Sequence, residues 1–289
     1  MHVATGSVAD IIRQKYPFVD IILGTGNLHM LKDAVVQAQN RKKFVNTDFC
    51  VYNEEDFSQY RTSYPNAWVN INYGCNNFCT YCIVPYVRGR ERSRALEDVL
   101  KEVKSLLDEG YKEITLIGQN VNSYGKDLPN NVTFATLLNE IAKLPGKFRL
   151  RFMTSHPKDL TEDIIDAIAS CPNICDNVHL PVQSGSTEIL RKMNRHYTRE
   201  DYLALVEKIR SKIPDVGITT DIMVGFPGET EEDFEEFCAF LKEVRFEGKV
   251  QFGFLLCLFT QKRHTRLFHR TGARRRQTGQ NRTSACLPK

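Results

Sequence analysis

The chain alternates between two hydrophobic patterns from residue 68 onward: short apolar runs, and segments with an apolar residue at every third or fourth position. This alternation is typical of βα units built around a parallel sheet. The apolar runs predict strands at residues 68–72, 114–117, 148–152, 177–181 and 218–224, with 250–254 as a sixth candidate. We expect the first of these strands to be buried.

The segments between the runs predict amphipathic helices. Residues 96–109 place six apolar side chains on one face and stop at Gly110, and residues 134–144 form the next helix. Thr161 opens a helix with acidic residues in its first turn, which suits the helix dipole. Thr198 and Thr230 each stand three residues before an Asp, the spacing of a capping box.

The polar and glycine-rich segments each follow the carboxyl end of an expected strand. In a (β/α) barrel the loops after the strands form the ligand-binding face. We therefore predict an α/β fold with a partial (β/α)6 barrel over residues 65–250. A doubly wound open sheet is the competing architecture, and hydrophobic periodicity does not separate the two.

Residues 1–64 have a different character. A helical pattern at 8–16, an apolar run at 18–23 and a second helical pattern at 31–38 predict the last part of a small α/β domain. Residues 44–62 are polar and acidic and are expected to form a linker.

Composition adds two points. With 42% hydrophobic and 26% charged residues the chain is an ordinary globular protein, and it lacks an apolar run of the roughly 20 residues that span a bilayer. The sequence also lacks the pattern of a signal peptide, so a cytoplasmic location is expected.

The net charge of +4 is unevenly distributed along the chain. Residues 249–289 hold ten Lys and Arg and no Asp or Glu, which leaves 29 basic against 35 acidic residues before them.

Cys75, Cys79 and Cys82 directly follow the first expected strand, with the spacing C-x3-C-x2-C. A closed zinc or iron–sulfur site takes four protein ligands, and this loop offers three. A [4Fe–4S] cluster held here would keep one iron open to another ligand. The alternatives are zinc held with a distant fourth residue, and a disulfide framework, which nine cysteines and the expected compartment disfavour.

The cysteine spacing is the signature of the radical S-adenosylmethionine enzymes, and residues 75–94 resemble the core of the methylthiotransferases among them. The segments 118–124 (GQNVNSY), 154–157 (TSHP), 180–186 (LPVQSGS) and 221–229 (DIMVGFPGE) agree in order and spacing. The sequence VPYVRGRERSR after the cysteines is most similar to the corresponding segment of the MiaB-type tRNA methylthiotransferases. The resemblance covers residues 8–248.

The resemblance implies a reaction and a set of site residues. Cys75, Cys79 and Cys82 would hold one [4Fe–4S] cluster, which splits S-adenosylmethionine to a 5′-deoxyadenosyl radical. The radical would lead to a 2-methylthio group on N6-isopentenyladenosine at position 37 of tRNA. By the family pattern, the residues that contact S-adenosylmethionine would be Tyr81, Gln119, Asn120, Ser155, Gln183, Ser184, Gly225, Gly228 and Glu229.

Two basic groups are candidates for binding tRNA. The first comprises Arg88, Arg90, Arg92 and Arg94, directly after the cysteines, where a basic stripe could hold phosphates. A salt-bridged surface is the alternative. The second comprises Arg191, Lys192, Arg195 and Tyr197, which could meet a base by stacking. Packing of Tyr197 beside the helix cap is the alternative. The expected partners are tRNA and a flavodoxin- or ferredoxin-like electron donor, with no membrane, and the chain is expected to be monomeric.

The sequence departs from the family at both ends. It has no cysteine before Cys50, so the ligands of the family's auxiliary cluster are missing from residues 1–64, which are expected to be the end of the N-terminal domain plus a linker. Residues 251–289 match neither the Tyr-Ser-Pro-Arg motif nor the TRAM domain, and are expected to be an aberrant basic tail from a frameshift or truncation. A basic tail that binds nucleic acid is the rival interpretation.

Three other functions stay open. A related methylthiotransferase could act on threonylcarbamoyladenosine in tRNA or on a ribosomal protein. A zinc-stabilised RNA-binding module would use the same cysteines without radical chemistry. A shortened fragment could bind the cluster and yet fail to modify tRNA.

Overall fold

The computed structural model describes residues 6–48, 61–246 and 251–253. Its central feature is a curved sheet of parallel strands. β3 (Asn66–Asn70), β6 (Glu113–Ile117) and β7 (Arg149–Phe152) pair side by side, β8 (Asn177–His179) pairs with β9 (Gly217–Thr219), and β10 (Asp221–Met223) pairs with β11 (Gln251–Gly253). A parallel bridge between Leu150 and Ile174 and another between Gln183 and Ile222 link these groups. Strands adjacent in sequence are therefore adjacent in the sheet, which is the order of a barrel.

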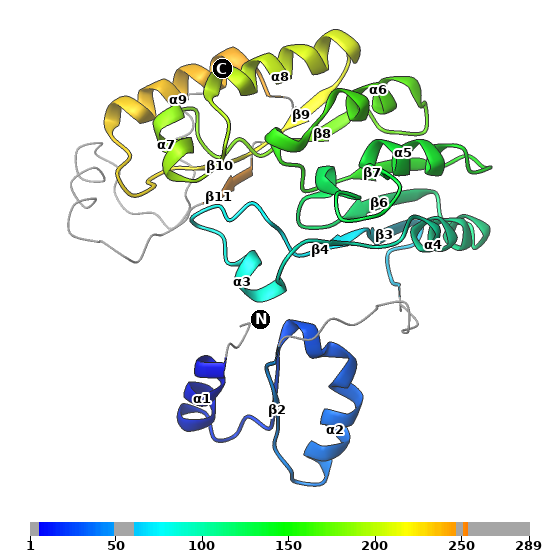
Figure 1. Ribbon diagram of the computed structural model, residues 1–289, viewed down its shortest axis with the longest axis vertical. Coiled ribbons are helices and arrows are strands. Elements are labelled where there is room, and N and C mark those ends of the chain that lie inside the picture. The colour runs from blue at the N-terminus through cyan, green and yellow to red at the C-terminus, as the bar shows by residue number, and fades with distance from the viewer. Residues whose placement is uncertain (1–5, 49–60, 247–250, 254–289) are drawn as a thin grey trace.

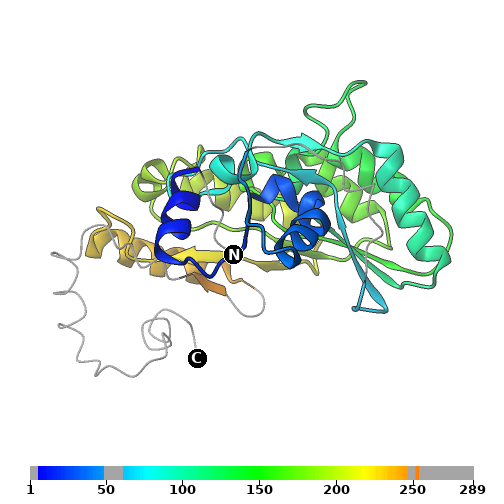
Figure 2. The ribbon, with the colours of Figure 1, turned by 90° about the horizontal axis from the view of Figure 1, so that it is seen from below.

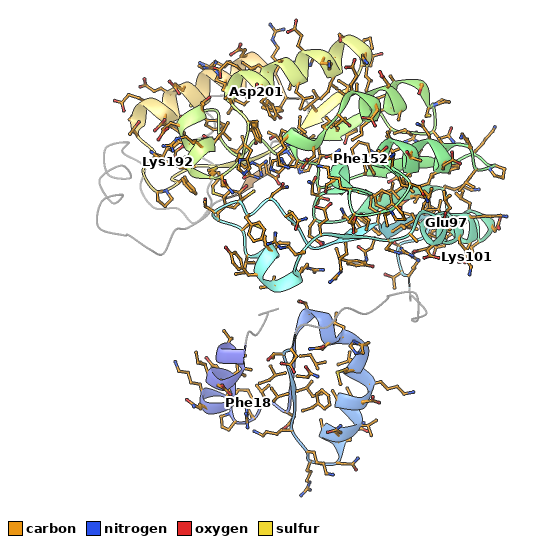
Figure 3. The ribbon with its side chains drawn as sticks, viewed as in Figure 1. Phe18, Glu97, Lys101, Phe152, Lys192 and Asp201 are labelled. Atoms are coloured by element: carbon orange, nitrogen blue, oxygen red, sulfur yellow. The ribbon has the colours of Figure 1, made fainter. Side chains whose placement is uncertain are left out.

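Helices cover the outer face of this sheet (Figure 1). They are α4 (Leu96–Asp108), α5 (Phe134–Ala142), α6 (Glu162–Ser170), α8 (Arg199–Lys212) and α9 (Glu231–Val244). In α4 the residues Val99, Val103 and Leu106 are buried, as the helical pattern predicts. Side chains of α4 that face away from the sheet, Glu97 and Lys101, lie at the molecular edge, whereas Phe152 lies in the interior (Figure 3).

The capping predictions are confirmed. Thr198 accepts a hydrogen bond from the backbone N–H of Asp201 at 3.1 Å, and Thr230 accepts one from Asp233 at 3.2 Å. Each Asp in turn accepts from the backbone N–H of its threonine, which satisfies two N–H groups that a helix start would leave open.

Two strand predictions need correction. The first strand is β3, in which Ala67 and Val69 are buried while Trp68 is 47% exposed. Because β3 lies at the edge of the three-stranded group, only alternate residues reach the core. The run at 218–224 is split at Thr220, whose hydroxyl donates to Leu180 O and accepts from Val182 N, so β9 ends and β10 begins there.

Several short elements were not predicted. They are β4 (Asn72–Tyr73), β5 (Arg92–Ser93), α3 (Val84–Arg88), α7 (Thr187–Lys192), η3 (Val121–Ser123) and η4 (Pro157–Asp159). β4 and β5 pair antiparallel on either side of the cysteine loop. None of these elements is longer than six residues, so none repeats its hydrophobic period often enough to be recognised in the sequence.

The N-terminal segment forms a small separate lobe (Figure 1), which overlaps the barrel in the view from below (Figure 2). It consists of α1 (Gly6–Lys15), β1 (Ile21–Leu23), η1 (Thr25–Met30), α2 (Leu31–Gln39) and β2 (Phe44–Asn46). β1 and β2 pair in parallel, so the expected linker at 44–62 begins with a strand, and residues 49–60 lie outside the described residues. The Thr25 hydroxyl donates to Val87 O over 2.6 Å, which joins the lobe to α3.

In the described part of the chain, no helix combines the length and the apolar character that crossing a membrane requires.

Candidate functional site

The three cysteines lie on one loop between β4 and α3. Cys75 and Cys79 are buried, Cys82 is half-buried, and all three are free thiols. Burial raises the pKa of the Cys75 and Cys82 thiols. Gly74 precedes them at φ +72, where an added Cβ would stand 2.2 Å from Arg90 O, so the turn into the loop requires glycine.

The turn after α7 holds this loop in place. Thr80 donates its backbone N–H to Met193 O and its hydroxyl to Lys192 O, both over 3.1 Å. The Asn194 amide donates to Asn77 O and Phe78 O at 3.3 and 3.1 Å. The conformation of the cysteine loop therefore depends on residues far along the chain.

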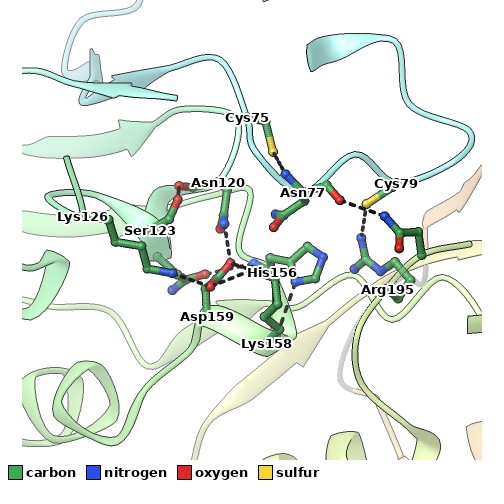
Figure 4. Close-up of polar contacts among 12 residues, drawn as sticks. Cys75, Asn77, Cys79, Asn120, Ser123, Lys126, His156, Lys158, Asp159 and Arg195 are labelled. Carbon is green, nitrogen blue, oxygen red and sulfur yellow. Dashed lines mark hydrogen bonds and ion pairs between the residues drawn. The ribbon is translucent and has the colours of Figure 1, made fainter. Parts of the chain in front are cut away.

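Arg195, on the same turn, reaches the cysteines from the interior (Figure 4). Its Nη1 donates to Cys79 Sγ at 3.5 Å and to the Tyr81 hydroxyl at 3.2 Å. Nε donates to the Tyr197 hydroxyl at 2.9 Å, and Nη2 to Pro181 O at 2.7 Å. Arg195 is only 4% exposed.

This position corrects the sequence interpretation of Arg195 and Tyr197 as a surface that stacks on a tRNA base. Tyr197 packs edge-on against His156 with ring centroids 5.8 Å apart, and its hydroxyl donates to Val182 O. Burial raises the pKa of Tyr197 to about 12, so its hydroxyl stays protonated. Arg191, by contrast, is an exposed side chain that pairs with Glu188 on α7.

A second polar cluster lies beside the cysteines, on the loops after β6 and β7 (Figure 4). Asp159 is 4% exposed and accepts from Asn120 Nδ2 at 2.7 Å, Lys126 Nζ at 2.6 Å and Lys158 Nζ at 2.9 Å. The buried His156 donates its backbone N–H to Asn122 Oδ1 at 3.0 Å. Burial, and then the charge of Arg195, lower the pKa of His156 to about 2, so its imidazole is neutral.

These two loops carry buried polar atoms that have no hydrogen-bond partner among the described residues: Gln119 Oε1, Asn120 Oδ1, Asn122 Nδ2, Ser155 Oγ and His156 Nε2. A buried unsatisfied polar group costs about 1–3 kcal/mol. Five such atoms on adjacent strand ends therefore fit a polar ligand that completes their hydrogen bonds. His156 and Asn122 are additions to the predicted site, although both stand in segments that the sequence singled out.

The remaining predicted cofactor contacts lie on the loops after β8 and β10. Gln183 adopts φ +71, and its backbone pairs with Asp221 and Met223 across the sheet. Ser184 is 1% exposed. The Glu229 carboxylate accepts the backbone N–H groups of Gly225 and Phe226, so it holds its own loop in shape. Gly228 O accepts from Lys192 Nζ at 3.0 Å.

The arginines that follow the cysteines do not form one stripe. Arg88 and Arg90 are exposed, and Arg90 lies 4.8 Å over the ring of Phe78. Arg94 points inward and pairs with Glu102 at 2.6 Å while donating to Asn70 O. Arg92 lies half-buried in β5. A phosphate-binding role is thus compatible with Arg88 and Arg90, whereas Arg94 is engaged in an internal ion pair.

The donor set fits the cofactors that the fold implies. Within residues 6–48 and 61–246, no three His, Cys, Asp or Glu side chains converge as ligands of a single ion. A [4Fe–4S] cluster bonds each cysteine to a different iron, so its three thiols need not meet at one point. Cys75, Cys79 and Cys82 would hold the cluster, and the unsatisfied polar atoms beside them would bind S-adenosylmethionine.

Curated relatives match most of the chain. It is 56% identical to a protein of Clostridium botulinum strain Hall named tRNA-2-methylthio-N(6)-dimethylallyladenosine synthase, over 85% of this chain and 55% of the relative. A protein of the same name from Clostridium tetani is 57% identical, over 85% of this chain and 54% of the relative. The chain spans about half the length of these relatives.

Solved structures share the fold. The radical S-adenosylmethionine methyltransferase TsrM from Kitasatospora setae, solved with cobalamin and a [4Fe-4S] cluster, superposes with a TM-score of 0.54 at 22% identity, covering 65% of this chain and 36% of TsrM. The cobalamin-dependent radical enzyme OxsB gives 0.53 at 14% identity, covering 75% and 35%. The sequence model described as the radical SAM superfamily matches residues 69–241. The chain belongs to the radical SAM superfamily.

Proposed function

We propose that this chain is the radical-generating part of a MiaB-type tRNA methylthiotransferase, which adds a 2-methylthio group to N6-isopentenyladenosine at position 37 of tRNA. The observation that carries the proposal is the position of three free thiols beside five unsatisfied buried polar atoms, on the strand ends of a radical SAM fold. The names of relatives at 56–57% identity support the choice of reaction and substrate.

The residues of the site would have the following roles. The three cysteines hold the cluster with one iron open, and Gln119, Asn120 and Ser155 orient S-adenosylmethionine through their unsatisfied atoms. Once bound, the cluster and S-adenosylmethionine would supply one-electron radical chemistry. The neutral His156 offers a donor at Nε2, because its Nδ1 accepts from Lys158 N.

The exposed face beside the cysteine loop is the proposed contact for tRNA. Arg88 and Arg90 are exposed there, next to Tyr86, which is 69% exposed. Arginines bind phosphates, and exposed aromatic rings stack on unpaired bases such as those of an anticodon loop. A flavodoxin- or ferredoxin-like electron donor, a monomeric state and a cytoplasmic location complete the proposal.

Anaerobic reconstitution of the purified chain with iron and sulfide tests the radical part. We expect about four irons per chain, as a [4Fe–4S] cluster requires, and 5′-deoxyadenosine on addition of dithionite and S-adenosylmethionine. Binding of zinc alone, without broad visible absorption, would contradict the proposal. The substrate is tested separately by incubating tRNA that carries either N6-isopentenyladenosine or threonylcarbamoyladenosine and measuring the added methylthio mass.

A further inference from the structure

Glu91 has a buried carboxylate oxygen that the surrounding protein does not satisfy. Its Oε1 atom is shielded from solvent and has no hydrogen-bond partner among the described residues. No other Asp or Glu in the described part of the chain carries such an atom. A buried polar atom without a partner is costly, so its presence in a folded protein calls for an explanation.

Other acidic side chains of the barrel that lie near Glu91 or near the cysteine loop have their partners. Glu102 pairs with Arg94 at 2.6 Å. Asp159 accepts hydrogen bonds from three side chains, and Glu229 accepts two from backbone N–H groups of its own loop. The open oxygen is therefore a specific feature of position 91.

The backbone around Glu91 is bound to the cysteine loop. The Glu91 N–H donates to Asn76 Oδ1 at 3.3 Å, and the Cys75 N–H donates to Gly89 O at 3.2 Å. Burial, and after it the charge of Glu91, raises the pKa of the Cys75 thiol. The Glu91 carboxyl thus lies close to one of the proposed cluster ligands.

The polar network around Asp159 borders the same carboxyl. Burial raises the pKa of Glu91, and the charge of Asp159 adds to the rise. A hydrogen bond with Ser123 and the charge of Lys126 act in the opposite direction. Ser123, Lys126 and Asp159 lie together below Cys75 (Figure 4). The carboxyl therefore lies where the cysteine loop meets the loop after β6, at the edge of the proposed cofactor site.

We propose that Glu91 is a specificity-determining residue that binds the substrate base, with its unsatisfied oxygen accepting a hydrogen bond from the N6–H of the adenosine. This inference rests on the proposed function, which supplies an N6-substituted adenosine as the substrate. The ring nitrogens of such an adenine accept hydrogen bonds, so N6–H is the one N–H that the base offers. An ionised carboxylate only accepts, and the two groups are therefore complementary.

The segment that carries Glu91 connects this contact with the proposed RNA face. Arg88 and Arg90, the proposed phosphate contacts, are exposed, whereas Glu91 is half-buried. One short stretch of chain thus presents positive charge to the outside and a hydrogen-bond acceptor to the inside. Enzymes that act on a base take it out of its stack and read its edge through hydrogen bonds. A nucleotide held at the arginines would turn its base inward to Glu91.

The test compares the binding of two anticodon stem–loop RNAs to the reconstituted protein, with S-adenosylmethionine present and without reductant. One RNA carries N6-isopentenyladenosine at position 37, and the other carries O6-isopentenylinosine, in which an ether oxygen replaces N6–H at nearly equal size. Fluorescence anisotropy gives both affinities. We expect the unsubstituted protein to prefer the N6–H RNA about tenfold or more, as a hydrogen bond to a charged group implies.

Three substitutions assign this preference to a residue. Glu91→Met removes the acceptor and should reduce the preference to less than about twofold, whereas Glu91→Gln keeps a carbonyl acceptor and should retain more of it. Asp127→Asn is the matched control, because it removes an equal charge from a carboxylate that already accepts from Ser93 N at 2.9 Å. The control should leave the preference unchanged, even where the lost negative charge strengthens binding of both RNAs.

Equal binding of the two RNAs by the unsubstituted protein, or an unchanged preference in Glu91→Met, would overturn the inference. If Glu91→Met does not fold, Glu91→Asp replaces it, since it withdraws the oxygen by one methylene and should also lower the preference. Loss of S-adenosylmethionine binding in Glu91→Met, measured by equilibrium dialysis, would assign the oxygen to the cofactor and overturn the inference as well. Failure of the unsubstituted protein to bind either RNA would instead reject the proposed function.

Discussion

The side-chain amide of Asn120 donates to Asp159 Oδ2 over 2.7 Å and so joins the loop after β6 to the loop after β7. Asp159 also accepts from Lys126 and Lys158. Burial alone would raise the pKa of the Asp159 carboxyl, but hydrogen bonds from Lys126, Lys158 and Asn120 outweigh burial and lower it to about 2. The carboxylate is therefore the centre of the network that shapes the proposed cofactor site.

Asp159→Ala should lower the free energy of unfolding by about 2–4 kcal/mol, because it leaves the Asn120 amide and the Lys158 ammonium without their acceptor. Urea unfolding of both proteins measures the difference. Lys126→Met is the control and should cost less than about 1 kcal/mol, since its side chain is 62% exposed. Ordinary surface substitutions change the free energy of unfolding by less than about 0.5 kcal/mol. A decrease below that value in Asp159→Ala would contradict this role.

His156 should make the protein less stable in acid. Its pKa is about 2 in the folded chain and about 6.5 in the unfolded chain. Between these values only the unfolded chain binds the proton, so the folded state loses stability as the pH falls below about 6.5. From pH 6 to pH 4.5, His156→Gln should reduce the slope of unfolding free energy against pH by up to about 1.4 kcal/mol per unit. The exposed His196→Gln is the control, and an unchanged slope in His156→Gln would refute the assignment.

Gly118→Ala should disturb the loop after β6. An added Cβ would stand 1.7 Å from Asn72 Oδ1, and Asn72 Nδ2 donates to Asn120 O at 2.7 Å. Overpacking of this kind costs about 1–3 kcal/mol. Combining Gly118→Ala with Asn72→Ala should cost less than the sum of the two changes, because the second removes the clash. Gly217→Ala, where the nearest atom belongs to the exposed Asn177 at 3.1 Å, should be milder. Strict additivity would show that the two residues do not interfere.

Replacement of Cys75, Cys79 and Cys82 together by Ser should abolish iron binding, because no thiolate would remain on the loop. The matched control is the double change Cys171→Ser and Cys175→Ser, which alters two free thiols on the segment between α6 and β8. We expect the control to retain about four irons. Iron and acid-labile sulfide analysis provides the measurement, and equal iron content in both proteins would rule out the cysteine loop as the cluster site.

Arg88→Gln and Arg90→Gln should each weaken tRNA binding and lower the slope of log affinity against log salt by about 1. Their side chains are exposed beside the cysteine loop. Arg149→Gln, an exposed residue at the start of β7, is the control at the opposite end of the strands. Fluorescence anisotropy at several salt concentrations gives both quantities. A slope that falls equally in all three variants would indicate unspecific attraction.

The sequence alone was sufficient for the long elements of the fold, because α4, α8 and α9 show several helical periods or a capping box, and the buried strands are short apolar runs. It was insufficient where tertiary contacts decide. The break at Thr220 depends on Leu180 and Val182 of another strand. The helices α3 and α7 have five and six residues, fewer than two helical turns, so their hydrophobic pattern does not repeat.

The site shows the same division. The cysteine spacing and the polar segments after the strands could be recognised in the sequence because the residues of each motif are close together along the chain. The segment with Arg195 and Tyr197 was interpreted as a basic and aromatic surface, because the burial of a side chain depends on distant parts of the chain and cannot be recognised from its sequence neighbours. Their partners, Cys79 and Val182, lie 116 and 15 positions away, and only the folded chain shows that both residues face inward.

The hydrogen bonds from Thr80 to the turn at Lys192 have a consequence for biosynthesis. Thr80 and Lys192 are 112 positions apart. At a synthesis rate of about 5–20 residues per second, the thiols leave the ribosome roughly 6–22 s before the segment that shapes their loop. During that interval the nascent cysteines are open to stray metal ions and oxidants. Delivery of iron and sulfur is thus best timed after the turn at Lys192 has been made.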